Sequence, residues 1–233
     1  MESLVGASAE ALKLLLTGDP EIWEIVGISF LVSFRAILFI VPPAMIVAFV
    51  LAFSGFPGRP YVITIVNSMI ALPAVVVGLL LYMLLYSSGP FGGWRLLFTQ
   101  TAMVIGQMIL AFPLLVAMSH VALQSIDLTA WQTARTLGAG KIWAMFTIMR
   151  EVRFGLIAAI VTAFGRVVSE VGCSIMVGGN ILHHTRNIPT AIALETSKGH
   201  FEQGIALGVV LITLALVLNF TIAIFRGRDM ARY

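Results

Sequence analysis

Residues 22–53 read IWEIVGISFLVSFRAILFIVPPAMIVAFVLAF, an apolar run interrupted by only two charged residues, Glu24 and Arg35. A helix of about 20 residues crosses the hydrocarbon core of a bilayer, so this run is longer than one straight crossing needs. Pro42 and Pro43 cannot donate a backbone hydrogen bond and are expected to kink the helix. The run predicts a membrane-spanning helix, in which Arg35 pairs with a neighbouring span or reaches toward the membrane surface.

Four further apolar segments follow, at 61–86, 100–121, 154–177 and 204–225. Of the 233 residues, 59% are hydrophobic and 11% are charged, whereas soluble domains carry roughly 25% charged residues. Backbone groups in lipid must pair within their own segment, which favours helices. The sequence therefore predicts an all-α, multi-pass protein of the cell membrane, with about five transmembrane helices in one domain over 1–233.

The basic residues outside these segments predict the orientation, because cytoplasmic loops of membrane proteins are rich in Lys and Arg. Eight lie on one side, and they are Arg59, Arg135, Lys141, Arg150, Arg153, Arg226, Arg228 and Arg232. Four lie on the other side, and they are Lys13, Arg95, Arg186 and Lys198. We therefore expect the C-terminus in the cytoplasm and the N-terminus outside. Residues 1–20 then form an external interfacial helix, since 4–16 are too few to cross.

The loop 122–153 lies on the cytoplasmic side and is amphipathic rather than simply polar. Ser125, Asp127 or Thr129 can cap a first helix that ends near Gly138 or Gly140. A second helix has a predicted apolar face, made by Ile142, Met145, Phe146 and Met149. Such a pair of helices suits docking into a groove of a partner protein. The alternative is a membrane-surface loop that only links two spans.

Two motifs with chemical meaning fail when their spacing is checked. Gly140 and Lys141 are compatible with a phosphate-binding loop, but the motif then requires Gly at Arg135 and Ser or Thr at Ile142. His183, His184 and His200 lack the carboxylate or cysteine spacing of a metal site. The net charge of +3 comes from scattered basic residues, which does not indicate nucleic-acid binding. We expect no enzyme activity, metal or cofactor, so any energy must come from a partner.

Two charges fall inside the fourth span, near the middle of the bilayer. Arg166 and Glu170 are four residues apart, which places both on one face of a continuous helix. A charge at this depth costs about 2.5–3.5 kcal/mol on insertion scales, so both should face protein or water. Either Arg166, Ser169 and Glu170 line a path for an anion, or the two charges form an ion pair that holds helices together.

The loop also resembles a known motif. It is similar to the EAA loop of ABC importer permeases, in which Glu-Ala-Ala precedes a Gly and, further on, an Ile. The matching stretch here is Gln132, Thr133, Ala134, Arg135, Thr136, Leu137, Gly138 and Ala139, followed by Ile148. In that family the loop forms the coupling helix that docks into the ATPase subunit. Gln132 stands where the family has Glu.

The resemblance extends over the segments 53–61, 72–80, 134–140 and 164–182, which together look like molybdate and tungstate importer permeases. The run 176–200 is most similar to the tungstate branch. The resemblance implies a type I ABC importer permease fold, a homodimer, two ATPase subunits that use ATP, and an external oxyanion-binding protein. The residues expected to contact that protein are Asn180, His183, His184 and Arg186.

Two other functions fit parts of the same pattern. An ion-coupled secondary transporter or channel could use Arg166 and Glu170 as a relay, although the sequence lacks the inverted repeat common in such carriers. A related ABC permease could instead transport another anion, such as sulfate.

Overall fold

The computed structural model of the chain describes residues 16–125, 136, 138 and 140–230, and over these residues the structure is helical without β-strands. The elements in chain order are α2 (Pro20–Phe53), α3 (Arg59–Met69), α4 (Ala74–Leu85), the 3-10 helix η1 (Gly92–Trp94), α5 (Gln100–Gln124), α7 (Lys141–Glu151), α8 (Arg153–Val168), α9 (Gly172–Gly178), α10 (Ile188–Lys198) and α11 (Phe201–Met230).

Three helices, α2, α5 and α11, are each long and apolar enough to cross a membrane. Two further helix pairs are long and apolar enough to cross a membrane only when the two helices of each pair are counted together. Both pairs are bent, by 94° between α3 and α4 and by 59° between α8 and α9. Counting each bent pair as one span gives five within the described residues, which agrees with the five predicted segments. The second and fourth segments are nevertheless broken, which the sequence alone did not predict.

Helix α2 is the first and the longest of the described helices. Asp19 caps its start by accepting hydrogen bonds from the backbone N–H groups of Glu21 and Ile22, and the helix continues through Pro42 and Pro43 without ending. Its buried stripe packs along α5. Several residues of that stripe are small, which lets the two helices approach closely.

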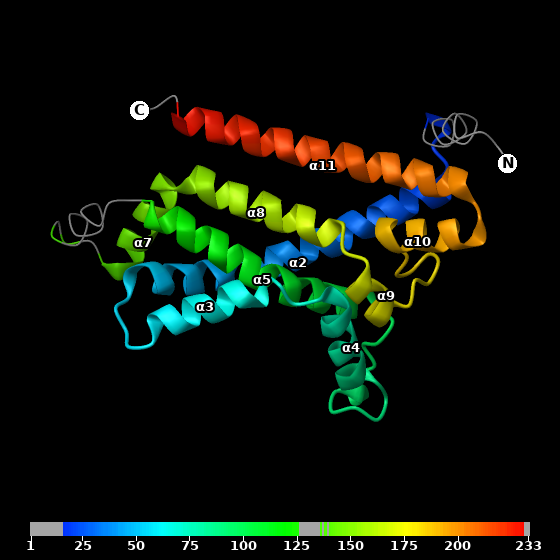
Figure 1. The fold of residues 1–233 in the computed structure, drawn as a ribbon, viewed down its shortest axis with the longest axis horizontal. Helices are drawn as coiled ribbons and strands as arrows, with labels where there is room; N and C mark the ends of the chain where they lie inside the picture. The colour runs from blue at the N-terminus through cyan, green and yellow to red at the C-terminus, as the bar shows by residue number, and fades with distance from the viewer. Residues whose placement is uncertain (1–15, 126–135, 137, 139, 231–233) are drawn as a thin grey trace.

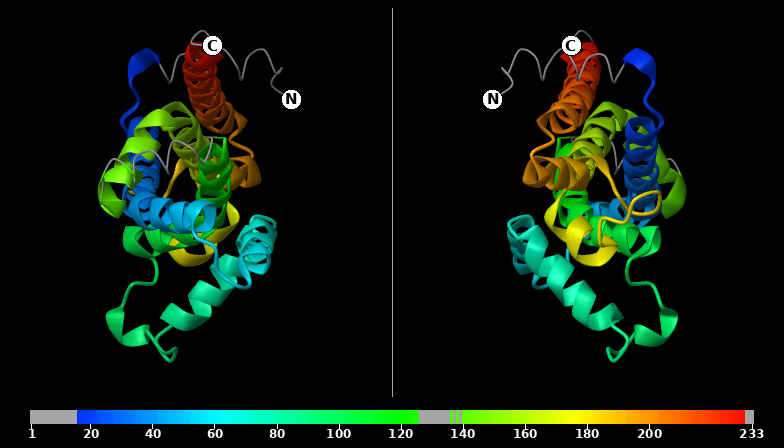
Figure 2. Two further views of the ribbon diagram at one scale, coloured as in Figure 1. Left: turned by 90° about the vertical axis from the view of Figure 1, so that its left-hand side faces the viewer. Right: turned by 90° about the vertical axis from the view of Figure 1, so that its right-hand side faces the viewer.

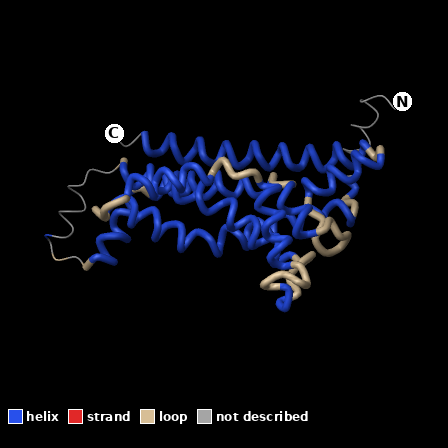
Figure 3. The backbone as a smooth tube through the Cα atoms, turned by 60° about the horizontal axis from the view of Figure 1, so that its bottom comes forward, coloured by secondary structure: helices blue, strands red, loops and turns tan. Residues whose placement is uncertain are grey.

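The long helices lie roughly side by side, and their connections gather at two opposite ends (Figure 1). The start of α3, helix α7 and the end of α11 lie at one end; the start of α2 and helix α10 lie at the other. The views along the bundle show α4 slanting away from it (Figure 2). The non-helical stretches are short and lie mostly at these ends and at the tip beyond α4 (Figure 3).

Between α9 and α11 the chain is irregular up to Asn187 and then forms the short helix α10. Asn187 and Thr190 form a capping box at its start, each side chain accepting from the other's backbone N–H. The predicted interfacial helix at 4–16 lies almost wholly outside the described residues.

Candidate functional site

The break between α8 and α9 is built around a buried carboxyl group. Helix α8 ends at Val168, and Glu170 is only 2% exposed. One oxygen of Glu170 accepts from the N–H of Cys173 at 3.0 Å, and the other accepts from the N–H and hydroxyl of Ser174 at 3.1 and 3.3 Å. The first N–H groups of a helix have no partner inside the helix. Glu170 therefore caps α9.

This arrangement corrects the prediction that Arg166 and Glu170 share a helix face. The helix stops between them, since Glu170 turns inward to the unpaired N–H groups of α9. Arg166 is exposed, and no ion pair joins it to Glu170 in the described part of the chain. Ser169 is also exposed, and its hydroxyl donates to the carbonyls of Gly165 and Arg166 at the end of α8. Arg166 and Ser169 are thus the polar groups that this break presents outward.

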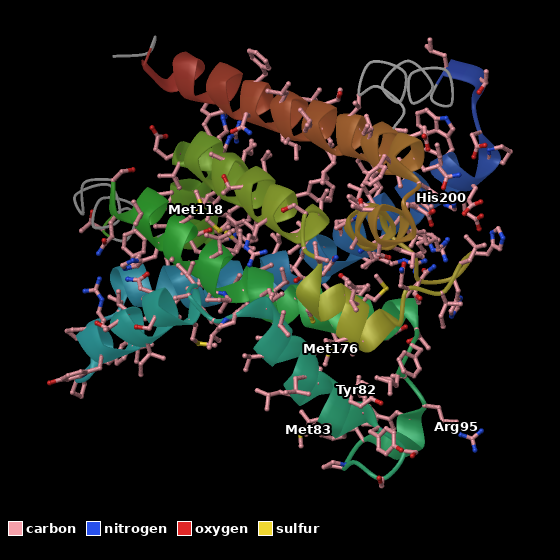
Figure 4. The ribbon with its side chains drawn as sticks, turned by 45° about the vertical axis from the view of Figure 1, so that its right-hand side comes forward. Tyr82, Met83, Arg95, Met118, Met176 and His200 are labelled. Carbon is pink, nitrogen blue, oxygen red and sulfur yellow. The ribbon has the colours of Figure 1, made fainter. Side chains whose placement is uncertain are left out.

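Glycines hold α9 tightly against α4 and α5. A Cβ atom on Gly78 of α4 would lie 2.8 Å from the Cα atom of Cys173, and Met176 of α9 lies beside α4 (Figure 4). A Cβ atom on Gly106 of α5 would clash with the Sγ atom of Cys173. A Cβ atom on Gly178 would lie 2.8 Å from the Sδ atom of Met103. The helix break is therefore closely packed on two sides.

The connection between α9 and α10 is tied to α2 by a hydrogen bond and an ion pair. His183 Nδ1 lies 2.6 Å from a carboxylate oxygen of Glu24, and Arg186 lies 3.4 Å from Glu21. Asn180 donates to the carbonyl of Thr190 at 3.3 Å. These three residues, which the sequence assigns to a binding-protein contact, also have partners within the chain. The acidic pair at the start of α2 is the sequence signal from which two of these partners could have been predicted.

A second link at this end runs through Gln100, at the start of α5. Its amide donates to the carbonyl of His184 at 2.8 Å, and its side-chain oxygen accepts from Arg35 at 3.4 Å. Arg35 thus pairs with a neighbouring span, which was one of its two predicted roles. The imidazole ring of His184 is left exposed.

The last turn of α10, before the connection to α11, contains a second buried carboxylate, Glu195. It accepts hydrogen bonds from Lys198 and His200, both at 2.9 Å, and His200 is visible at this turn in Figure 4. Burial by itself raises the pKa of the Glu195 carboxyl, but the hydrogen bonds and positive charges of Lys198 and His200 outweigh it and hold the pKa below its usual value. The sequence did not single out Glu195.

The predicted coupling loop is described only in part. Gln132 to Arg135, Leu137 and Ala139 lie outside the described residues. Gly138 has a φ of +85° and nothing within 4 Å of the position a Cβ atom would take. Thr136 and Gly138 are both exposed. A positive φ is strained for residues with a side chain, so this backbone favours glycine.

The second predicted helix of the loop is present as α7. Ala144 and Ile148 are buried, at 0% and 2% exposure, and Ile148 belongs to the hydrophobic core of the bundle. Phe146, on the apolar face predicted to be available to a partner, is 56% exposed, and Trp143 is 74% exposed. Two large aromatic rings therefore remain uncovered on α7, which begins three residues after Gly138.

Comparison with known proteins identifies the family, although no family model matches the sequence. The tungstate uptake system permease protein TupB of Campylobacter jejuni is 37% identical over 211 residues, covering 91% of this chain and 88% of the relative. The molybdenum transport system permease protein ModB of Escherichia coli K12 is 35% identical, covering 88% of this chain and 92% of the relative. The chain belongs to the ABC transporter permeases of the tungstate and molybdate type. The permease is thus a multi-pass protein of the inner membrane.

Solved structures support the fold of the permease. An inward-facing form of the MetNI methionine ABC transporter matches it with a TM-score of 0.64 at 18% identity, covering 89% of this chain and 94% of that chain. An amino acid ABC transporter gives a TM-score of 0.64 at 16% identity. The permease therefore has the fold of a type I ABC importer permease, as the sequence predicted.

Proposed function

We propose that this permease imports tungstate, or the similar anion molybdate, and is driven by ATP hydrolysis in a separate subunit. The main support for this proposal is the 37% sequence identity between this chain and a tungstate uptake permease, over 91% of the chain. Sulfate permeases are more distant, at 28% identity over 73% of the chain for one from Synechocystis. This difference favours a tungstate or molybdate substrate over sulfate.

The proposed assembly is a homodimer of the permease with two ATPase subunits and an external oxyanion-binding protein. The end of the bundle that carries Arg59, Arg150 and Arg153 faces the cytoplasm, since it holds most of the basic residues outside the spans. The opposite end, with α10 and the exposed ring of His184, receives the binding protein. Because His183 and Arg186 are held by Glu24 and Glu21, they present a fixed surface rather than mobile side chains.

Within the membrane, Arg166 and Ser169 are proposed to line the anion path. An exposed Arg in an apolar helix requires water or another protein as its surroundings, and a water-filled path between two copies of the chain supplies both. Glu170 acts at the same break by holding α9 rather than by neutralising Arg166. The guanidinium thereby remains available to attract an anion as it passes.

Residues 132–139 are proposed to dock into the ATPase, with Gly138 closing the docking helix. The exposed rings of Trp143 and Phe146 beside it offer apolar contact area to that partner. Closure of the two ATPase subunits would move these segments together and open the path outward.

Uptake by the reconstituted importer tests this proposal. Proteoliposomes holding the permease and ATPase should accumulate tungstate only with ATP and the binding protein, and Gly138→Asp should abolish uptake and stimulated ATP hydrolysis while leaving membrane insertion intact. The matched control is Gly27→Ala, at an open position on α2. Normal uptake by Gly138→Asp would overturn the docking role. Uptake that needs a proton gradient but no ATPase would instead establish a secondary transporter.

The substrate is tested separately by competition. Molybdate and sulfate are added in excess to the tungstate uptake assay, with the binding protein present. Competition by molybdate but not by sulfate is expected. Full competition by sulfate would favour the broader anion permease.

A further inference from the structure

A hollow of about 410 Å³ opens between α3 and the last turn of α5 and is lined by Arg59, Pro60, Ile63, Thr64 and Gln124. Its lining residues come from the start of α3 and the end of α5, two segments that lie at the same end of the bundle (Figure 1). None of them belongs to the proposed anion path, to residues 132–139 of the coupling loop or to the connection between α9 and α10.

Arg59 is held in a fixed position on one side of the hollow. Its Nε atom donates to the carbonyl of Leu51 at 2.6 Å, and its Nη2 atom donates to the carbonyl of Ala52 at 3.3 Å. The last carbonyls of a helix lack partners inside it, so they anchor the guanidinium there. Arginine has five N–H donors. Those on Nη1 have no hydrogen-bond partner among the described residues.

The opposite side of the hollow offers a further polar group. The amide of Gln124 is exposed and has no hydrogen-bond partner in the described part of the chain. None of the described residues that line the hollow is acidic. The Gln124 amide group is a second hydrogen-bond donor for an anion held by Arg59.

The surroundings of the hollow place it at a membrane surface. Tyr61 is 77% exposed and Ile65 is 59% exposed on α3, directly beside the lining residues. Tyrosine is enriched at the level of lipid headgroups, and basic pockets between transmembrane helices bind anionic headgroups. A fixed guanidinium with free N–H groups also matches the geometry of a phosphate-like anion.

We propose that this hollow binds a tetrahedral oxyanion, with Arg59 as the main donor and Gln124 as the second. The group is either the phosphate of an anionic phospholipid or a free oxyanion of the kind the permease transports. Both present tetrahedrally arranged anionic oxygens, although a phosphodiester headgroup carries one negative charge and free tungstate carries two, so the two sources are separated by experiment. The site is independent of the path through Arg166, and transport is not required for it to bind.

Binding is measured on the complete permease–ATPase complex in detergent, with two probes in separate arms. Native mass spectrometry counts bound phosphatidylglycerol against phosphatidylcholine, and equilibrium dialysis measures bound sodium tungstate in lipid-free detergent. We expect one probe to bind, and we expect Arg59→Gln to weaken binding of that probe at least tenfold. Gln124→Leu, at an exposed position where folding is not at risk, should weaken binding of the same probe several-fold.

Arg153→Gln is the matched control, because it removes one positive charge at the same end of the bundle, outside the hollow. It should leave binding of the probe unchanged within about twofold. If phosphatidylglycerol binds and its binding is weakened by Arg59→Gln and Gln124→Leu, the hollow is a headgroup site. If tungstate binds and its binding is weakened by the same substitutions, the hollow is a free-anion site. The proposal is overturned if neither probe responds to Arg59→Gln and Gln124→Leu, or if Arg153→Gln weakens binding equally.

Discussion

The break between α3 and α4 and the break between α8 and α9 interrupt two apolar spans, but different groups make them. At the first break, Pro73 precedes α4, no side chain caps that helix, and residues 70–73 are exposed. At the second break, the buried Glu170 supplies three hydrogen bonds to α9, and glycines of α4 and α5 press against that helix. The first bend follows from local backbone chemistry, whereas the second depends on one carboxyl group and its surroundings.

The largest expected effect tests the dependence on that carboxyl group. Glu170→Ala should destabilise the permease by about 3 kcal/mol, because it removes the cap and leaves buried N–H groups of α9 unpaired. Thermal unfolding of the purified protein in detergent measures the loss. Glu170→Gln keeps one side-chain oxygen, so its stability should lie between that of Glu170→Ala and that of the wild type. Wild-type stability in Glu170→Ala would mean that packing alone holds the second break.

The next effect tests the packing around the second break. Gly106→Ala should cost about 1–3 kcal/mol, because its new methyl group meets the Sγ atom of Cys173. Adding Cys173→Ala should recover about 1 kcal/mol of that loss in a double-mutant cycle, since it removes the clashing sulfur. Gly27→Ala on α2, where nothing lies within 4 Å, is the control and should not destabilise. Strictly additive losses would show that Cys173 does not limit this contact.

Glu195 is a buried carboxylate like Glu170, but it pairs with the side chains of Lys198 and His200 instead of capping a helix. Comparing the two residues therefore separates the effect of burial from the effect of capping. Its lowered pKa means that its contribution to stability is present above the ordinary pKa of 4.5 and is lost as the pH falls through the lower pKa of the folded state. Glu195→Gln should therefore lose about 1–2 kcal/mol at neutral pH and lose less than wild type on further acidification. Unfolding measured from pH 7 to pH 3 tests this, and parallel curves for both proteins would contradict it.

The smallest effect is expected at the first break. Pro73→Ala should destabilise by at most about 1 kcal/mol, mainly by giving the unfolded chain more freedom, because alanine keeps the backbone carbonyl that accepts from Val76 and Val77. The same unfolding assay applies. A loss as large as that of Glu170→Ala would show that the two breaks are equally dependent on single residues.

Most of the fold could be predicted because burial in lipid imposes a pattern that a single sequence carries. The five apolar segments and the second helix of the loop 122–153 appear in the structure close to their predicted places. The prediction that Arg166 and Glu170 share one helix face was wrong, because it assumed that the helix continues past Val168. Apolar spacing identified an apolar stripe on α7 but not which of its residues the bundle covers, as it covers Ile148 and leaves Phe146 exposed.

The sequence by itself determined the class, the number of spans and the family of this permease, because hydropathy and motif spacing are local properties of the chain. Only the tertiary structure decided where the spans break and what Glu170, Glu195 and Arg59 do. Each of these side chains acts on groups that become available only after folding: the N–H groups of α9, the cations at the turn into α11, and the last carbonyls of α2. Residue spacing cannot report such contacts, since the partner atoms are unpaired only in the folded arrangement.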